Sequence, residues 1–354
     1  MDDAALQGLE VGPRASLDAE VVAVASHRYD LGVVLDVRDI GGMYNLNAQV
    51  RTSSGAFVIR VHRPWVKPER LSMLHNLRSA LFADGFPVAR PVTSFTGSTF
   101  TTFGDRLLEV EHFVESDGET DSWERYEAAF ALLGRLHDFL FTWFERKTFV
   151  FPRWSNYAPP DTLVRWMGKT TERVERERIE SAGIGLEFGT AVRLCDDALN
   201  VLRLVEGWWS SNGSSLPGRP IHGDYGGGNV LFENEAIKLV VDFDFLSIRE
   251  RVYELAYSLY WMLRRLEGDQ PPESLSWIRL REMLHAYNAS TSRPLDAREL
   301  AALPMQMARV AVHWVAEAWL TEDPLRNVVA QEPGVEVARW LTRQEKKVTA
   351  LLHP

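Results

Sequence analysis

One stretch of the chain decides the fold: residues 221–246 read IHGDYGGGNVLFENEAIKLVVDFDFL. It has the pattern of a loop, a short β-hairpin and a turn, with Asp224 and Asn229 in the loop and Asp242 after the apolar run Ile237–Val241. Phosphoryl transfer from ATP needs a carboxylate that orients and deprotonates a hydroxyl, and two oxygen ligands that hold a divalent cation on the phosphates. The three polar residues therefore predict a kinase, and the competing interpretation is a polar turn in an unrelated fold.

The same residues resemble a known family. The segments HGDYGGGN at 222–229 and VVDFD at 240–244 are similar to the catalytic segment of the aminoglycoside phosphotransferase/choline kinase superfamily, the small-molecule relatives of protein kinases. The resemblance implies that Asp224 is the catalytic base and that Asn229 and Asp242 are ligands of Mg²⁺. It also implies that ATP is the phosphoryl donor, and GTP is not excluded.

Side-chain chemistry is compatible with these roles. The carboxylate of Asp224 is ionised at neutral pH and can accept a proton from a hydroxyl within hydrogen-bond reach. Asn229 and Asp242 supply the hard oxygen ligands that Mg²⁺ prefers. His222, grouped with Asp224 as a catalytic residue, is expected to hold the loop rather than to react. Glu254 stands where the family usually has the Asp of an Asp-Leu-Ala sequence.

The first third of the chain has the periodicity of a small antiparallel sheet. Alternating apolar residues and intervening turns predict five strands, with one main helix over 68–83 after the third strand. Ser16 is expected to cap an earlier helix that runs to about Arg28. The predicted strands span 33–40, 46–51, 56–62, 99–103 and 106–113.

After residue 115 the pattern becomes helical, and strand signals are confined to Val230–Phe232 and Ile237–Val241. His137 lies on an apolar helix and is expected to be a core residue with its hydrogen bonds satisfied. The predicted helices span 123–144, 163–181, 188–210, 253–266, 275–288, 297–320 and 335–352. The fold class is therefore α+β: a protein-kinase-like, two-lobed fold. Residues 1–114 form the nucleotide-binding lobe, and residues 115–354 form a helical lobe with the catalytic loop and the acceptor site.

A glycine turn between the first two predicted strands is the candidate phosphate-covering loop. Gly41, Gly42 and Asn45 lie in this turn, and the resemblance implies that they contact the nucleotide. Backbone N–H groups in such a turn can meet phosphate oxygens.

Arg60 stands where kinase-like folds place the basic residue of the third strand. Its guanidinium can pair with phosphate through two parallel hydrogen bonds. In such folds a Glu on the following helix normally orients the basic side chain, and that place falls near Leu74 in this sequence. How Arg60 is oriented is therefore an open question.

The segment from Glu111 to Val114 is the expected hinge between the lobes. Its backbone would pair with the edge of the adenine, so Glu111, Phe113 and Val114 are assigned to nucleotide binding. The sequence does not distinguish ATP from GTP at this place.

Composition narrows the partners. The chain has 354 residues and a formal net charge of −10, which argues against nucleic-acid binding because that needs clustered positive charge. No apolar run reaches the ~20 residues of a membrane span, and the N-terminal residues do not read as a secretion signal. We expect a cytoplasmic protein, and a protein partner is possible.

Three functions remain open from the sequence. The first is transfer of the γ-phosphoryl of ATP to a small polar acceptor, such as an aminoglycoside or another antibiotic, an amino alcohol or homoserine. The second is a Ser/Thr kinase of a protein or of a natural-product precursor peptide. The third is a pseudokinase that binds a nucleotide or a partner without chemistry, and the absent helix Glu is the feature that favours it.

Overall fold

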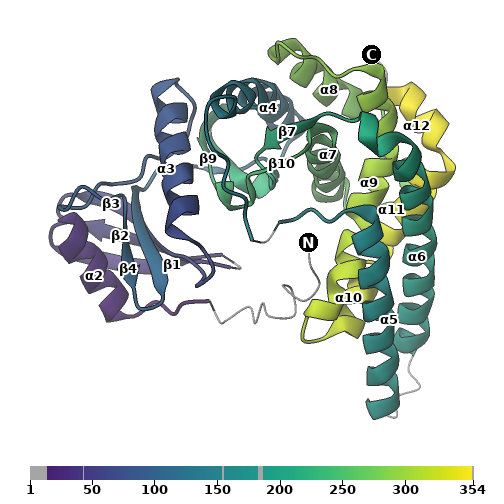
Figure 1. The fold of residues 1–354 in the computed structure, drawn as a ribbon, viewed down its shortest axis with the longest axis horizontal. Helices are drawn as coiled ribbons and strands as arrows, with labels where there is room; N and C mark the ends of the chain where they lie inside the picture. Colours follow the sequence, from purple (N-terminus) through teal and green to yellow (C-terminus); the bar gives the residue numbers. More distant parts are fainter. Residues whose placement is uncertain (1–13, 43, 154, 182–185, 353–354) are drawn as a thin grey trace. The chain divides into compact units, whose positions relative to one another are not determined.

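The computed structural model describes residues 14–42, 44–153, 155–181 and 186–352. The chain divides into two compact units, which we describe separately (Figure 1). The described residues within 1–119, 146–154 and 228–246 form the strand-rich unit, and those within 120–145, 155–227 and 247–354 form the helical unit. The sequence placed a single boundary after residue 114, whereas in the structure the hairpin segment 228–246 also belongs to the strand-rich unit.

The predicted five-stranded antiparallel sheet is confirmed. Its strand order is β1-β2-β3-β5-β4, and every neighbouring pair is antiparallel. The bounds agree closely with those expected from the turns. The strands are β1 (Val34–Gly41), β2 (Leu46–Thr52), β3 (Gly55–Val61), β4 (Phe100–Phe103) and β5 (Arg106–His112).

Strand alternation gives this sheet one apolar and one polar face. Side chains of successive residues point to opposite faces. Helix α2 (Ala19–Tyr29) packs on the apolar face. That core contains Leu46, Ala48, Val50, Phe57, Ile59, Val61, Leu108 and Val110. The opposite face carries Asn47, Arg60 and Glu109, which are direct cross-strand neighbours on β2, β3 and β5.

Two helices flank this sheet. The main helix α3 (Pro68–Ala83) has the predicted bounds. The cap of α2 was predicted wrongly: Asp18, not Ser16, accepts the backbone N–H of Val21 at 2.9 Å. An Asp two residues later serves the same purpose as the expected Ser.

The hairpin predicted from the catalytic segment is present in the strand-rich unit. It consists of β8 (Val230–Glu233) and β9 (Ala236–Val240). A two-residue strand, β6 (Gly118–Glu119), pairs with β8 and was not predicted. Its brevity leaves no alternation to recognise.

The helical unit contains most of the predicted helices, with small changes of bounds. They are α4 (Trp123–Phe144), α5 (Pro160–Ser181), α6 (Leu186–Asn212), α7 (Arg251–Glu267), α8 (Arg279–Ser290) and α9 (Ala297–Glu317). The last predicted helix is two helices, α11 (Glu332–Arg343) and α12 (Glu345–Leu352), and α10 (Pro324–Ala330) was missed. None of the helices described here is long and apolar enough to cross a membrane.

The prediction of no further strands in this part of the chain was wrong. β7 (Gly218–Ile221) pairs with β10 (Ser247–Glu250). β7 contains Pro220, which lowers its strand propensity and removes a backbone donor. The His222–Asp224 loop begins directly after β7, and α7 begins directly after β10. This strand pair therefore positions the start of the loop and the start of α7.

Candidate active site

The loop that carries Asp224 is held by one buried carboxylate, that of Glu254 on α7. Glu254 accepts hydrogen bonds from the backbone N–H of His222 at 3.0 Å and from the backbone N–H of Gly223. Gly223 has a φ of +90°, which a residue with a β-carbon adopts only with strain. Glu254 thus replaces the usual Asp at this place and fixes the start of the loop.

His137 completes this arrangement, as the sequence predicted for a core histidine. Its Nε2 lies 2.8 Å from Glu254, and its Nδ1 lies 2.8 Å from the hydroxyl of Tyr287. Burial raises the pKa of Glu254, but the hydrogen bond from His137 and the backbone donors outweigh it, so the net pKa is lowered. Glu254 is therefore ionised, and His137 is a structural residue.

Asp224 itself is half-buried and contacts a tyrosine that the sequence analysis did not identify. The hydroxyl of Tyr257, on α7, donates to Oδ1 of Asp224 at 2.6 Å. Burial and the charge of Asp224 raise the pKa of Tyr257 well above its usual value, so Tyr257 keeps its proton and acts as a donor. The backbone N–H of Asp224 donates to Nδ1 of His222 at 3.3 Å, which agrees with the expected loop-holding function of His222.

In the strand-rich unit, the hairpin β8–β9 brings Asn229 and Asp242 to the same end. The backbone N–H of Val241 donates to the carbonyl of Asn229 at 3.0 Å, so the two residues flank adjacent strand ends. Asp242 has a φ of +65°. A left-handed backbone at a residue other than glycine is uncommon and clusters at functional sites.

The carboxylate of Asp242 fits a divalent cation. Its Oδ1 is buried and accepts no hydrogen bond among the described residues, and Nη1 of Arg60 lies 3.8 Å from it. Burial and the neighbouring charge of Asp244 raise the pKa of Asp242 to about 6. A cation at Oδ1 would offset both effects, and Mg²⁺ is commonly held by one or two carboxylates together with substrate phosphates and water.

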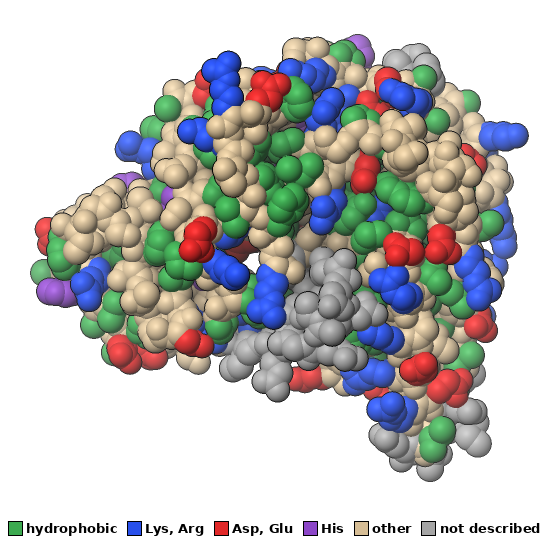
Figure 2. All heavy atoms as spheres, viewed as in Figure 1, with side chains coloured by type: hydrophobic (Ala, Val, Ile, Leu, Met, Phe, Trp, Pro, Cys, Tyr) green, Lys and Arg blue, Asp and Glu red, His purple; other side chains and the backbone are tan. Residues whose placement is uncertain are grey.

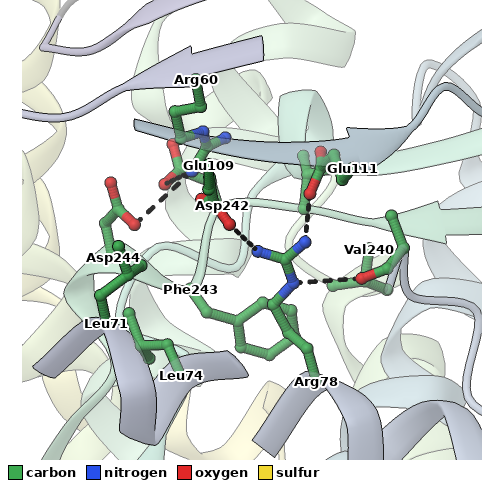
Figure 3. A pocket seen from close by; sticks show the side chains of 12 residues that line it. Arg60, Leu71, Leu74, Arg78, Glu109, Glu111, Val240, Asp242, Phe243 and Asp244 are labelled. Atoms are coloured by element: carbon green, nitrogen blue, oxygen red, sulfur yellow. Dashed lines mark hydrogen bonds and ion pairs between the residues drawn. The ribbon is translucent and has the colours of Figure 1, made fainter. Parts of the chain in front are cut away.

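Arg60 faces these carboxylates on the polar side of the sheet. Its Nη1 lies 3.5 Å from Asp244, and its Nε donates to Oδ1 of Asn47 at 2.9 Å. Figure 3 shows Arg60 and Arg78 around the same small cavity of about 20 Å³, which the carboxylates of Asp242 and Asp244 also line. The cavity belongs to the strand-rich unit alone.

The glycine turn has the backbone angles that only glycine adopts readily. Gly41 and Gly42 have φ values of +91° and +114°. The N–H of Gly41 donates to the carboxylate of Asp39 at 2.8 Å. Asn45, predicted to contact the nucleotide, donates to Asp244 at 2.6 Å. In this structure Asn45 therefore fixes Asp244. Met43 lies outside the described residues.

The expected hinge lies at the end of β5. The carboxylate of Glu111 pairs with Arg78, and the N–H of Phe113 donates to the carbonyl of Ala56 at 3.0 Å. The Phe113 donor is therefore engaged within the sheet. The assignment of Glu111, Phe113 and Val114 to adenine stays a prediction.

Sequence reasoning missed two side chains that contact predicted site residues. Tyr257 lies three residues after Glu254 on α7, so the two side chains share one helix face. Asn47 is the second residue of β2, and Asn45 lies just before that strand. Both spacings are visible in the sequence, but the residues that Tyr257 and Asn47 contact become known only from the fold.

The chain matches one known protein family over more than half of its length. Residues 36–276 match the model of the phosphotransferase enzyme family. The chain belongs to this family. It is 25% identical over 334 residues to a homoserine kinase of Bradyrhizobium sp., a match that covers 91% of each chain.

Solved structures confirm the kinase-like fold. A microcompartment-associated aminopropanol kinase superposes with a TM-score of 0.63 at 19% identity, covering 94% of this chain and 99% of that one. An aminoglycoside phosphotransferase from Alicyclobacillus acidocaldarius gives a TM-score of 0.59 at 18% identity, covering 95% and 98%. Both likenesses concern the fold.

The family confirms the predicted enzyme class. The chain is an ATP-dependent phosphotransferase that acts on a hydroxyl group, and this class of reaction uses a divalent metal. The pseudokinase alternative is therefore not favoured. On the face drawn in Figure 2, acidic and basic side chains are interspersed among the described residues.

Proposed function

We propose that the chain transfers the γ-phosphoryl group of ATP to the side-chain hydroxyl of homoserine or of a closely related amino alcohol. The observation that supports a kinase most strongly is the carboxylate of Asp224, which Tyr257 orients on a loop fixed by Glu254. Homoserine is the first choice of acceptor because a homoserine kinase matches this chain over nearly the full length of both.

Asp224 is the proposed catalytic base. It aligns the acceptor hydroxyl and accepts its proton as the oxygen attacks phosphorus. Tyr257 limits the carboxylate to one orientation, and His222 holds the backbone beneath it. Because reaction rates depend steeply on alignment, these two contacts support the catalytic assignment.

The strand-rich unit is proposed to bind the nucleotide. Asn229 and Asp242 would hold Mg²⁺, and the bound ion would neutralise charge on the phosphates. Arg60 and the turn of Gly41 and Gly42 are proposed to contact the phosphates. The segment from Glu111 to Val114 is proposed to meet the adenine.

An acceptor panel tests this proposal. ADP release is measured with homoserine, 1-amino-2-propanol, choline, an aminoglycoside and a Ser-containing peptide, each with Mg²⁺-ATP and with Mg²⁺-GTP. Mass spectrometry then identifies the phosphorylated product. We expect homoserine to give the highest kcat/KM. A much higher value for the aminoglycoside or the peptide would overturn the choice of acceptor.

Replacement of Tyr257 by Phe should lower kcat about tenfold, because loss of a charge-assisted hydrogen bond removes the orientation of Asp224. The KM for ATP should stay unchanged. Steady-state kinetics with the best acceptor measure both. Tyr260→Phe is the matched control, since Tyr260 is a buried tyrosine on the same helix. Equal kcat values for the two variants would show that Tyr257 does not orient the base.

A further inference from the structure

The helix that should orient Arg60 presents no carboxylate to it. Leu71 and Leu74 of α3 line the same cavity as Arg60, and both are buried (Figure 3). The position near Leu74, where kinase-like folds have an orienting Glu, thus lines the same cavity as Arg60, but its side chain is apolar. Some other group must fix the guanidinium.

Two polar residues of α3, His75 and Arg78, contact Glu109 of β5 instead. Glu109 accepts from His75 at 2.6 Å, from Arg78 at 3.0 Å and from His62 at 3.0 Å. The helix therefore contributes a His and an Arg and the strand contributes the carboxylate, the reverse of the usual arrangement of a helix Glu and a strand cation. Glu109 accepts these three hydrogen bonds on its two oxygens. It therefore links α3 to the sheet and does not orient Arg60.

Arg60 is instead held by its other cross-strand neighbour, Asn47 on β2. The two residues are in register, and Oδ1 of Asn47 accepts the Nε–H of Arg60 at 2.9 Å. The side chain of Arg60 is only 13% exposed, so its orientation depends on these few contacts. With Nε engaged, Nη1 points toward Asp244 and Asp242.

The same amide also contacts the glycine turn. Nδ2 of Asn47 donates to the carbonyl of Gly41 at 3.0 Å. A Cβ on Gly42 would clash with this amide and would lie 2.8 Å from the carbonyl of Asn45. The side-chain amide of Asn47 therefore contacts the glycine turn through Nδ2 and the guanidinium of Arg60 through Oδ1.

We propose that Asn47 is a positioning residue that takes the place of the missing helix carboxylate, fixing Arg60 for the phosphates and linking it to the Gly41–Gly42 turn. This inference rests on the proposed role of the strand-rich unit in nucleotide binding. The amide of Asn47 is neutral, so the negative charge beside Arg60 comes from Asp244, whose carboxylate is fixed by a hydrogen bond from Asn45.

A double-mutant cycle on binding tests the proposal without any acceptor. The dissociation constant of Mg²⁺-ATP is measured by calorimetry for wild type, Asn47→Ala, Arg60→Met and the double variant. Loss of a hydrogen bond to a charged group should weaken binding about ten- to hundredfold in Asn47→Ala. If Asn47 acts through Arg60, the same substitution should cost little in the Arg60→Met background.

Three controls separate this role from a merely structural one. Adenosine, which lacks phosphates, should bind Asn47→Ala and wild type equally. Asn47→Asp, which keeps an acceptor for Nε, should recover part of the lost affinity. Arg51→Ala, an exposed position on the same strand, should bind like wild type.

Two results would overturn the proposal. One is wild-type affinity for Mg²⁺-ATP in Asn47→Ala. The other is an equal loss on removal of Asn47 with and without Arg60. Failure of wild type itself to bind Mg²⁺-ATP would instead contradict the proposed function.

Discussion

Replacement of Asp224 by Asn should lower kcat by roughly 10²- to 10⁴-fold, the usual contribution of a positioned general base. An amide can still accept the hydrogen bond of Tyr257, so the loop should keep its structure, but it cannot accept the acceptor's proton. The affinity for Mg²⁺-ATP should be nearly unchanged, since Asp224 is assigned to the acceptor. ADP release and calorimetric binding measure the two quantities.

Asp161→Asn is a suitable control, because Asp161 is an exposed residue of the same unit that pairs with a surface Arg at i+4. It should retain full turnover. Turnover of Asp224→Asn within a few-fold of wild type would exclude Asp224 as the base. Loss of nucleotide affinity in parallel with kcat would place Asp224 in the binding of the nucleotide instead.

Replacement of Glu254 by Ala should have the largest effect on stability. Removal of a buried carboxylate leaves two backbone N–H groups and the ring of His137 without their partner, and breaking a buried pair in this way costs about 3–5 kcal/mol of unfolding free energy. Urea unfolding followed by far-UV circular dichroism measures the change. A loss below about 1 kcal/mol would show that Glu254 does not hold the loop.

The sign of the pH dependence follows from the lowered pKa of Glu254. The usual pKa of a Glu is 4.5, and that of Glu254 in the folded chain is lower. As the pH falls, the unfolded chain therefore takes up this proton before the folded chain does. Glu254 therefore contributes its full stability above about pH 4.5, and the contribution is lost as the pH falls below it. The free energy of unfolding of Glu254→Gln should vary less between pH 5 and pH 3 than that of wild type.

Local patterns were sufficient to predict most of the fold. Turn glycines and strict alternation marked the five strands of the sheet, and the segment from Asp224 to Asp242 indicated the enzyme class. The strand β7 was missed because Pro220 and a length of four residues leave no strand signal. The break between α11 and α12 was also missed, because the apolar periodicity continues across it.

The contacts of the site could be predicted only in part. The sequence predicted no orienting Glu near Leu74, which lines the cavity beside Arg60, but it did not show which group could replace that Glu. Asn47 and Tyr257 act through partners 13 and 33 residues away along the chain. Such pairings depend on strand register and on helix placement, which are properties of the folded chain.

Asp242 is proposed to hold a divalent cation for a bound nucleotide, and a melting series tests this role most directly. Wild type and Asp242→Ala are heated with ATP or GTP, each with Mg²⁺ or with EDTA. A ligand at 100-fold its dissociation constant adds about 2.7 kcal/mol. We predict a rise in melting temperature with Mg²⁺-ATP that EDTA and Asp242→Ala both abolish. An equal rise in Asp242→Ala, or no rise in wild type, would contradict the account.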